Sequence, residues 1–178
     1  MNHRVRIILA AVFFFSMLQM PLAAQVERVG VFNSRKGFGI ALERKVDKLS
    51  YNTFTIFADM YGRYMTDEGH CGVKLNFTHS HILQGWQKGD SEIYIFAGAG
   101  ATAGYVHEFG FPPEQYLPMC ALSGKAGVFA ALPGKIDLSL SFTGEAGICL
   151  DSDSGTLHIY AEGLQSTIWP ELTIYFRF

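Results

Sequence analysis

The sequence predicts an all-β chain folded as an eight-stranded antiparallel up-and-down β-barrel. Three observations lead to this fold class: apolar and polar residues alternate through most of the chain, the alternating segments number eight, and the last one ends in an aromatic residue. Alternation with a period of two is typical of strands, because successive side chains point to opposite faces. An even number of strands returns both ends of the chain to the same side of a closed antiparallel barrel.

The closing segment, Pro170 to Phe178, shows this alternation clearly. One face carries Leu172, Ile174, Phe176 and Phe178, and the other carries Glu171, Thr173, Tyr175 and Arg177. Terminal residues are usually frayed and polar, so a final residue Phe178 that is the fourth apolar position of one face indicates a strand held in place to its end. We expect this strand to pair with the first one, Val26 to Phe32, and close the barrel.

The other strands follow from the same alternation and from the turn residues between them. Their expected ranges, in chain order, are 26–32, 37–43, 52–64, 71–83, 91–106, 120–132, 136–148 and 168–178. Short turns at 44–51, 85–90 and 133–135 would lie on the side of the termini. The connections at 33–36, 65–70, 107–119 and 149–167 would lie on the opposite side. Residues 157–160, within the longest connection, would extend strands beyond the wall.

Residues 1–24 have the character of a secretory signal peptide and leave residues 25–178 as the barrel domain. Arg4 and Arg6 make a basic start, Ile7 to Leu18 is an apolar run, and Ala23-Ala24 is a small-residue exit. The apolar run is shorter than the roughly 20 residues that a membrane-spanning helix needs. We therefore expect an exported protein.

Composition favours a membrane barrel over a soluble one. Hydrophobic residues make up 49% of the chain and charged residues 17%, against about 25% charged in soluble domains. Beyond the leader, no stretch of about 20 residues is continuously apolar, so a spanning helix is not expected. The net charge of −2 gives no basic footprint for nucleic acid.

The polar face of the strands should point into the barrel, because an eight-stranded interior is narrow and holds side chains rather than solvent. By alternation this face carries five acidic and five basic residues, and buried charges need partners. The expected lumen charge network consists of Arg28, Asp59, Arg63, Lys74, Glu92, Lys125, Asp137, Glu145, Glu171 and Arg177. The aromatic residues Phe57, Tyr61, Tyr94, Phe96 and Tyr175 should fill the space between them, so that the lumen is closed. Tyr64, Tyr105 and Trp169, near strand ends, should form interfacial girdles.

With a leader, eight alternating strands, short turns on one side and a terminal aromatic residue, the chain resembles the small outer-membrane β-barrels of the OmpA/OmpX kind. The resemblance covers residues 25–178 as a pattern and rests on no catalytic motif. It implies a transmembrane β-barrel in the bacterial outer membrane, with outer-membrane lipid and the barrel-assembly machinery as partners. It also implies that Phe178 belongs to the signal by which that machinery recognises the chain.

Members of such a family include enzymes, adhesins and structural barrels, so fold alone does not set function. The leading expectation is a non-enzymatic protein of the envelope, structural or in contact with an extracellular partner through its outer loops. One alternative is a lipid-modifying barrel enzyme of the lipid A acylase or deacylase type. The other is a soluble exported ligand-binding β-barrel, with its apolar face inward.

Candidate chemical motifs are weak, and we expect no catalytic residue, cofactor or metal. The glycines of Gly98 to Gly104 do not have the spacing of a dinucleotide-binding loop and lie within a strand. In His79-Ser80-His81, alternation points Ser80 inward and both histidines outward, which is poor geometry for a nucleophile and its base. The residues at the outer rim that an enzyme would use are His70, His107, Glu108 and Ser123.

The three cysteines do not have zinc-binding spacing. Cys120 and Cys149 begin and end one hairpin and lie nearly opposite each other, which makes a disulfide possible in an exported protein. Strict alternation places them on opposite faces, which opposes that bond unless a bulge intervenes. Both the disulfide and buried thiols stay open at this point.

Overall fold

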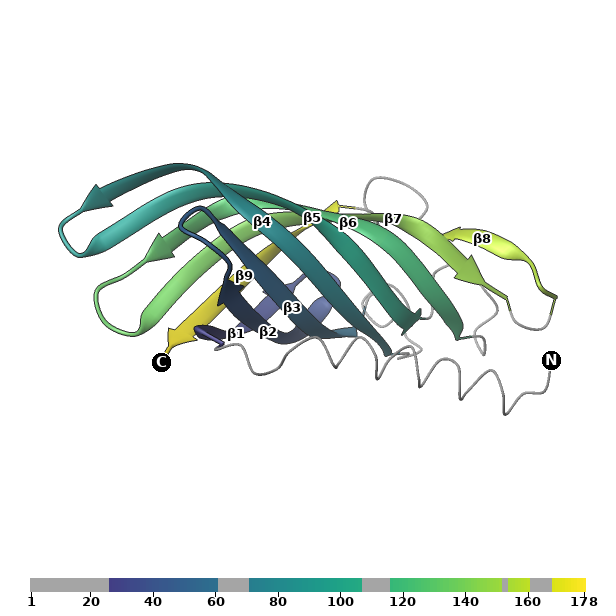
Figure 1. The fold of residues 1–178 in the computed structure, drawn as a ribbon. Helices are drawn as coiled ribbons and strands as arrows, with labels where there is room; N and C mark the ends of the chain where they lie inside the picture. The colour runs from purple at the N-terminus through teal and green to yellow at the C-terminus, as the bar shows by residue number, and fades with distance from the viewer. Residues whose placement is uncertain (1–25, 61–70, 107–115, 152–153, 161–167) are drawn as a thin grey trace.

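A computed structural model describes residues 26–60, 71–106, 116–151, 154–160 and 168–178, whose strands form one antiparallel sheet that closes on itself (Figure 1). The proposed signal peptide, residues 1–24, lies outside the described residues. The described strands are β1 (Arg28–Ser34), β2 (Gly37–Lys45), β3 (Ser50–Asp59), β4 (Gly72–Lys88), β5 (Ser91–Val106), β6 (Leu117–Ala131), β7 (Ile136–Leu150), β8 (Leu157–Tyr160) and β9 (Ile168–Arg177).

Eight of these strands make the barrel wall. Each pairs with the next in chain order from β1 to β7, β9 pairs with β7, and β9 also pairs with β1. The last strand therefore closes the barrel against the first, with Arg28 opposite Arg177 and Ser34 opposite Glu171. The predicted all-β, eight-stranded antiparallel barrel and its closing pair are confirmed.

The short strand β8 continues the edge of β7 beyond the point where β9 stops. β9 pairs with β7 as far as Ile168 opposite Gly144, and β8 pairs with residues 147–150 of β7. Figure 1 shows β8 at the end of the barrel away from the C-terminus. Residues 157–160 thus extend the pairing of β7, as the sequence suggested.

The connections at the terminus side are short. The β4–β5 turn consists of Gly89 and Asp90, and the β6–β7 turn contains Gly134. Both glycines have positive φ, 61° at Gly89 and 99° at Gly134, which a residue with a Cβ rarely adopts. In Figure 1 these turns lie at the same end as the C-terminus, which is the side expected for them.

Strand β4 is longer than its alternation predicted. It runs to Lys88, and its register against β5 shifts between Ile82 and Gln84. The bulge at Leu83 reverses which residues point outward, so the alternation breaks there and the sequence predicts a turn at 85–90 instead of a continuing strand. That prediction was wrong, because one inserted residue changes the phase of a strand without ending it.

The aromatic residues predicted to fill the barrel do so wherever they are described. Phe57, Tyr94, Phe96 and Tyr175 are buried, and Tyr94 stacks on Phe129 with ring centroids 4.7 Å apart. Tyr61 lies outside the described residues. Together with Phe32 and Tyr51 these rings form one cluster inside the wall. The interior is therefore packed with side chains, as expected for eight strands.

The outer face of the wall is apolar. Its exposed side chains include Val31, Ile40, Ile56, Leu122, Leu140, Phe142, Leu172 and Ile174. Their neighbours along each strand, such as Ser139 and Ser141 on β7, are buried in the lumen. Within the described ranges, no helix has the length and apolar character needed to cross a membrane.

Candidate functional site

The barrel interior is the one place where alternation gathers charged side chains from many strands, and it is the candidate site. The ion pairs there fall into three groups. We call them the lower cluster (Arg28, Glu43, Asp137 and Arg177), the central pair (Lys125 and Glu171) and the upper cluster (Asp59, Lys74 and Glu145). The lower cluster lies nearest the termini.

The lower cluster is organised around Asp137, which is fully buried. Arg28 Nε lies 3.0 Å from Asp137 Oδ2, and Arg177 Nη2 lies 3.0 Å from Asp137 Oδ1. Arg28 also donates to Glu43, and its guanidinium lies over the Phe129 ring, 4.7 Å from the centroid. β1, β2, β7 and β9 each contribute one charge, so the cluster holds together the region where the barrel closes.

The upper cluster is organised around Lys74 on β4. Its Nζ lies 2.8 Å from Asp59 Oδ2 and 3.0 Å from Glu145 Oε2. Thr102 donates to the other Glu145 oxygen at 2.8 Å, and the Phe57 ring centroid is 4.7 Å from Lys74 Nζ. A buried ammonium is tolerated because two carboxylates and an aromatic face replace its water.

Two buried residues near the upper cluster extend it. Lys36, in the β1–β2 turn, points its Nζ at the Trp169 ring, 4.6 Å from the centroid. Lys74 Nζ lies 5.2 Å from the same centroid. Trp169 is 3% exposed, so its expected place in an interfacial girdle is wrong. It shares the inward face of β9 with Glu171 and Tyr175.

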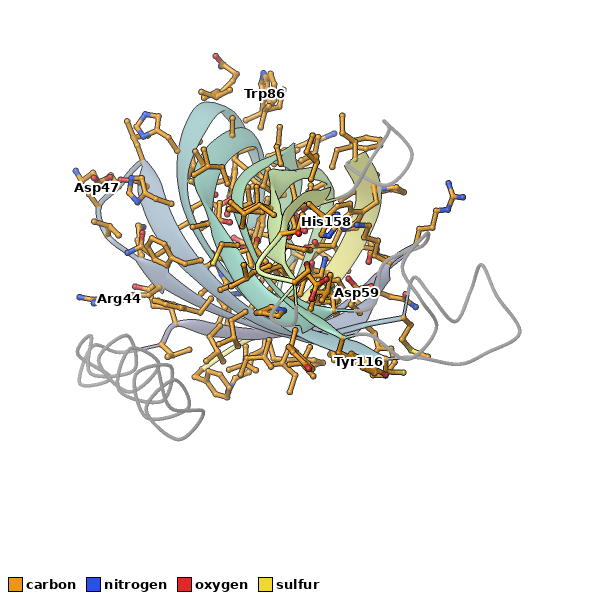
Figure 2. All side chains as sticks on the ribbon, turned by 90° about the vertical axis from the view of Figure 1, so that its right-hand side faces the viewer. Arg44, Asp47, Asp59, Trp86, Tyr116 and His158 are labelled. Atoms are coloured by element: carbon orange, nitrogen blue, oxygen red, sulfur yellow. The ribbon has the colours of Figure 1, made fainter. Side chains whose placement is uncertain are left out.

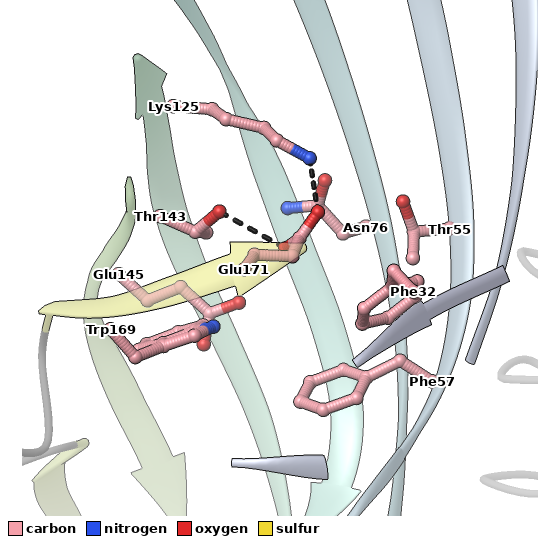
Figure 3. Close-up of a pocket in the computed structure, with 9 residues that line it drawn as sticks. All are labelled: Phe32, Thr55, Phe57, Asn76, Lys125, Thr143, Glu145, Trp169 and Glu171. Atoms are coloured by element: carbon pink, nitrogen blue, oxygen red, sulfur yellow. Dashed lines mark hydrogen bonds and ion pairs between the residues drawn. The ribbon is translucent and has the colours of Figure 1, made fainter. Parts of the chain in front are cut away.

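The two residues of the central pair, Lys125 and Glu171, are among the pocket-lining residues drawn in Figure 3. Lys125 donates to Glu171 there, and Thr143 donates to the second Glu171 oxygen at 3.2 Å. Beside this pair is a cavity of about 20 Å³, which has room for about one water molecule. It is lined by Phe32, Thr55, Phe57, Asn76, Lys125, Thr143, Glu145, Trp169 and Glu171.

Eight of the ten charges expected in the lumen network take part in these clusters. They are Arg28, Asp59, Lys74, Lys125, Asp137, Glu145, Glu171 and Arg177. Arg63 lies outside the described residues. Glu92 departs from the expectation, because it lies near the free end of the β4–β5 hairpin, where its side chain is exposed to solvent.

Sequence reasoning missed two buried charges, Glu43 and Lys36. Glu43 continues the inward face of Gly39 and Ala41 on β2, so alternation contained the signal. Lys36 had no such signal, because it lies in a turn and its burial depends on Trp169, more than a hundred residues further along the chain.

The candidate catalytic residues are not brought together in the described part of the chain. His79 and His81 are exposed on the outer face of β4, and Ser80 is buried in the lumen. Ser123 is buried and accepts a hydrogen bond from Asn76 Nδ2 at 2.8 Å. The other rim residues, His70, His107 and Glu108, lie outside the described residues.

Cys120 and Cys149 are not joined by a disulfide. The register places Cys120 opposite Ile148 and Cys149 opposite Met119, one position apart. Cys120 is exposed on the outer face and Cys149 is buried in the lumen, without an intervening bulge. The possible disulfide is therefore excluded by the pleat, because the two sulfurs point to opposite sides of the sheet.

No group of three or more histidine, cysteine or acidic side chains with metal-binding geometry occurs among the residues that the structure describes. Comparison of the chain with protein-family models, with curated proteins and with solved structures found no match.

Proposed function

We propose that this chain is a small outer-membrane β-barrel protein of bacteria, non-enzymatic and with a closed lumen. It would be exported by residues 1–24 and serve the integrity of the envelope or contact an extracellular partner. Outer-membrane lipid and the barrel-assembly machinery would be its partners inside the cell envelope.

The observation that carries the proposal is that the two faces of the barrel wall are reversed relative to a soluble barrel, with the polar face inside and the apolar face outside. Charged and hydroxyl side chains share the interior with a cluster of aromatic rings, while Val31, Ile56, Leu122 and Leu140 are exposed on the outer face. A soluble barrel buries its apolar face, and soluble monomers rarely expose contiguous apolar surface beyond a few hundred Å². An apolar outer band around a polar interior is what a lipid bilayer requires of a spanning barrel.

The packed lumen favours a structural or surface role over transport. The central cavity has room for about one water molecule, and ion pairs lie above and below it. A soluble ligand-binding barrel needs an open, apolar interior, which these residues do not provide. Surface contact would use the two longest expected connections, residues 107–119 and 149–167, at the end opposite the C-terminus.

The test compares arginine at two depths on one outer face. Leu140 lies mid-strand on β7 and Ile136 lies at its terminus-side end, and both are exposed. In a bilayer, Leu140→Arg should lower the free energy of unfolding by about 2–4 kcal/mol and Ile136→Arg by about 0–1 kcal/mol. Urea titration of both variants in lipid vesicles measures the difference. Equal, near-zero effects would show that the outer face meets water, and the proposal would fail.

A further inference from the structure

The apolar outer wall is interrupted at one place by polar side chains that follow one another across three strands. Arg44 on β2 lies opposite Asn52 on β3, and Asn52 lies opposite His79 on β4. His81 lies two residues further on β4 and is also exposed on the outer face. We call these four residues the outer polar patch. Figure 2 shows Arg44 and Asp47 pointing away from the barrel on the same side.

The patch presents hydrogen-bond donors to the outside. His79 Nδ1 lies 2.7 Å from Asn52 Oδ1. Because an amide oxygen only accepts, the ring nitrogen donates, and the Asn52 Nδ2 hydrogens stay available for an outside acceptor. The Arg44 guanidinium adds further donors and a fixed positive charge. In hydrocarbon these groups are costly unless a ligand satisfies them.

The charge around the patch is positive. Arg44, Lys45 and Lys48 are exposed there, against the two acids Glu27 and Asp47. The Asp47 carboxylate accepts hydrogen bonds from the Ser50 hydroxyl and from the Leu49 N–H, the latter at 2.7 Å. The hydrogen bond from Ser50 lowers the pKa of Asp47, so this acid stays ionised and is engaged within its own turn.

The wall beside the patch is open to an acyl chain. Ala99 lies opposite His79, and Gly124 lies opposite Ala99, so small residues continue the same row across β5 and β6. A Cβ added at Gly124 would meet only the Gly98 carbonyl oxygen, at 3.9 Å. On the next row the Phe54 and Phe77 rings pack with centroids 4.8 Å apart.

We propose that the outer polar patch binds the phosphate headgroup of an anionic phospholipid in the leaflet on the terminus side. The inference rests on the proposed membrane location. Arg44 and the Asn52 amide meet the phosphate oxygens, His79 and His81 flank them, and an acyl chain lies over Ala99 and Gly124. A second copy of the chain fits this face less well, because a twofold contact here would bring two Arg44 side chains together.

The test measures lipid preference directly. Wild-type protein is refolded into phosphatidylcholine vesicles, and its association with spin-labelled phosphatidylglycerol is compared with that of spin-labelled phosphatidylcholine. We expect the labelled anionic lipid to associate more strongly with the wild type. Arg44→Gln combined with Asn52→Leu should weaken that association about tenfold, since each lost bond involves a charged group. Arg35→Gln is the matched control, because Arg35 is exposed at the other end of the barrel.

Several outcomes would overturn the inference. One is equal association of the two labelled lipids with the wild type, and another is an equal loss in the Arg35→Gln control. Displacement of the labelled lipid by millimolar inorganic phosphate would indicate a site for free anions. A dimer seen by sedimentation that the double variant dissociates would identify a second copy as the occupant. If the wild type never forms a heat-modifiable, membrane-inserted band, the proposed location fails instead, and the inference falls with it.

Discussion

Lys74 Nζ on β4 lies 3.0 Å from Glu145 Oε2 on β7, although β5 and β6 separate these strands in the sheet. The ion pair therefore crosses the lumen rather than following the wall. Asp59 on β3 holds the same ammonium from its neighbouring strand at 2.8 Å. One lysine thus ties three strands of the barrel together through its interior.

Replacing Lys74 with methionine should strongly destabilise the barrel. The substitution leaves the Asp59 and Glu145 carboxylates buried without their cation, which costs about 3–5 kcal/mol. Urea unfolding in detergent micelles, followed by tryptophan fluorescence, measures the change. Lys88→Met is the control, because Lys88 is exposed at the end of the same strand.

The same cluster can be made neutral as a whole. Adding Asp59→Asn and Glu145→Gln to Lys74→Met should recover most of the lost free energy of unfolding, because no buried charge is then left unpaired. If Lys74→Met unfolds at the same urea concentration as Lys88→Met, the lysine does not hold the lumen together.

Two glycines on neighbouring strands should tolerate the same substitution to very different degrees. A Cβ at Gly100 would lie 1.8 Å from the Phe77 carbonyl oxygen, whereas a Cβ at Gly124 meets nothing closer than 3.9 Å. Gly100→Ala should therefore cost about 1–3 kcal/mol by forcing the backbone apart. Gly124→Ala should stay within about 0.5 kcal/mol of wild type. Urea titration gives the concentration at which each variant is half unfolded, and we expect the lower value for Gly100→Ala. The reverse order would contradict the register of β4, β5 and β6.

The purified protein should not conduct ions steadily. The interior of an eight-stranded barrel is just wide enough for side chains, and here the cavity beside Lys125 and Glu171 is about 20 Å³. Planar-bilayer recording should show no porin-sized steps, with a 16-stranded porin as the positive control for insertion. Stable conductance levels of the wild type would mean that the charged side chains in the lumen move apart to form a channel.

The last residues should have two separable roles. Deleting residues 175–178 removes Tyr175 from the core and Arg177 from Asp137, and it opens the β1–β9 seam. Each backbone group left open in an apolar medium costs several kcal/mol, so the truncated chain should fail to refold in detergent. At the proposed outer-membrane location it should also fail to accumulate in cells.

Phe178→Ala should separate assembly from folding. Phe178 is 83% exposed at the end of the closing strand, so its loss should leave refolding in detergent unchanged. If Phe178 is part of the assembly signal, outer-membrane abundance in cells should fall for this variant. Heat-modifiable gel mobility reports both steps. Unchanged abundance in cells would assign Phe178 no role in assembly.

Much of the fold could be predicted because alternation is a local property. The face on which a side chain lies follows from its place in a strand, and this was enough to put Asp137, Glu145 and Glu171 in the lumen. The same rule failed at the end of β4, where the bulge at Leu83 reversed the phase. It also missed Lys36, which lies in a turn and has no strand face.

The sequence by itself determined which residues share a face of each regular strand, because a pleated strand sends alternate side chains to opposite faces. Only the tertiary structure decided which of them meet. Arg28 reaches Asp137, and Lys74 reaches Glu145, across strands that do not pair with each other. Such contacts depend on how far the strands are staggered when the sheet closes, and stagger is a property of the whole barrel rather than of any one strand.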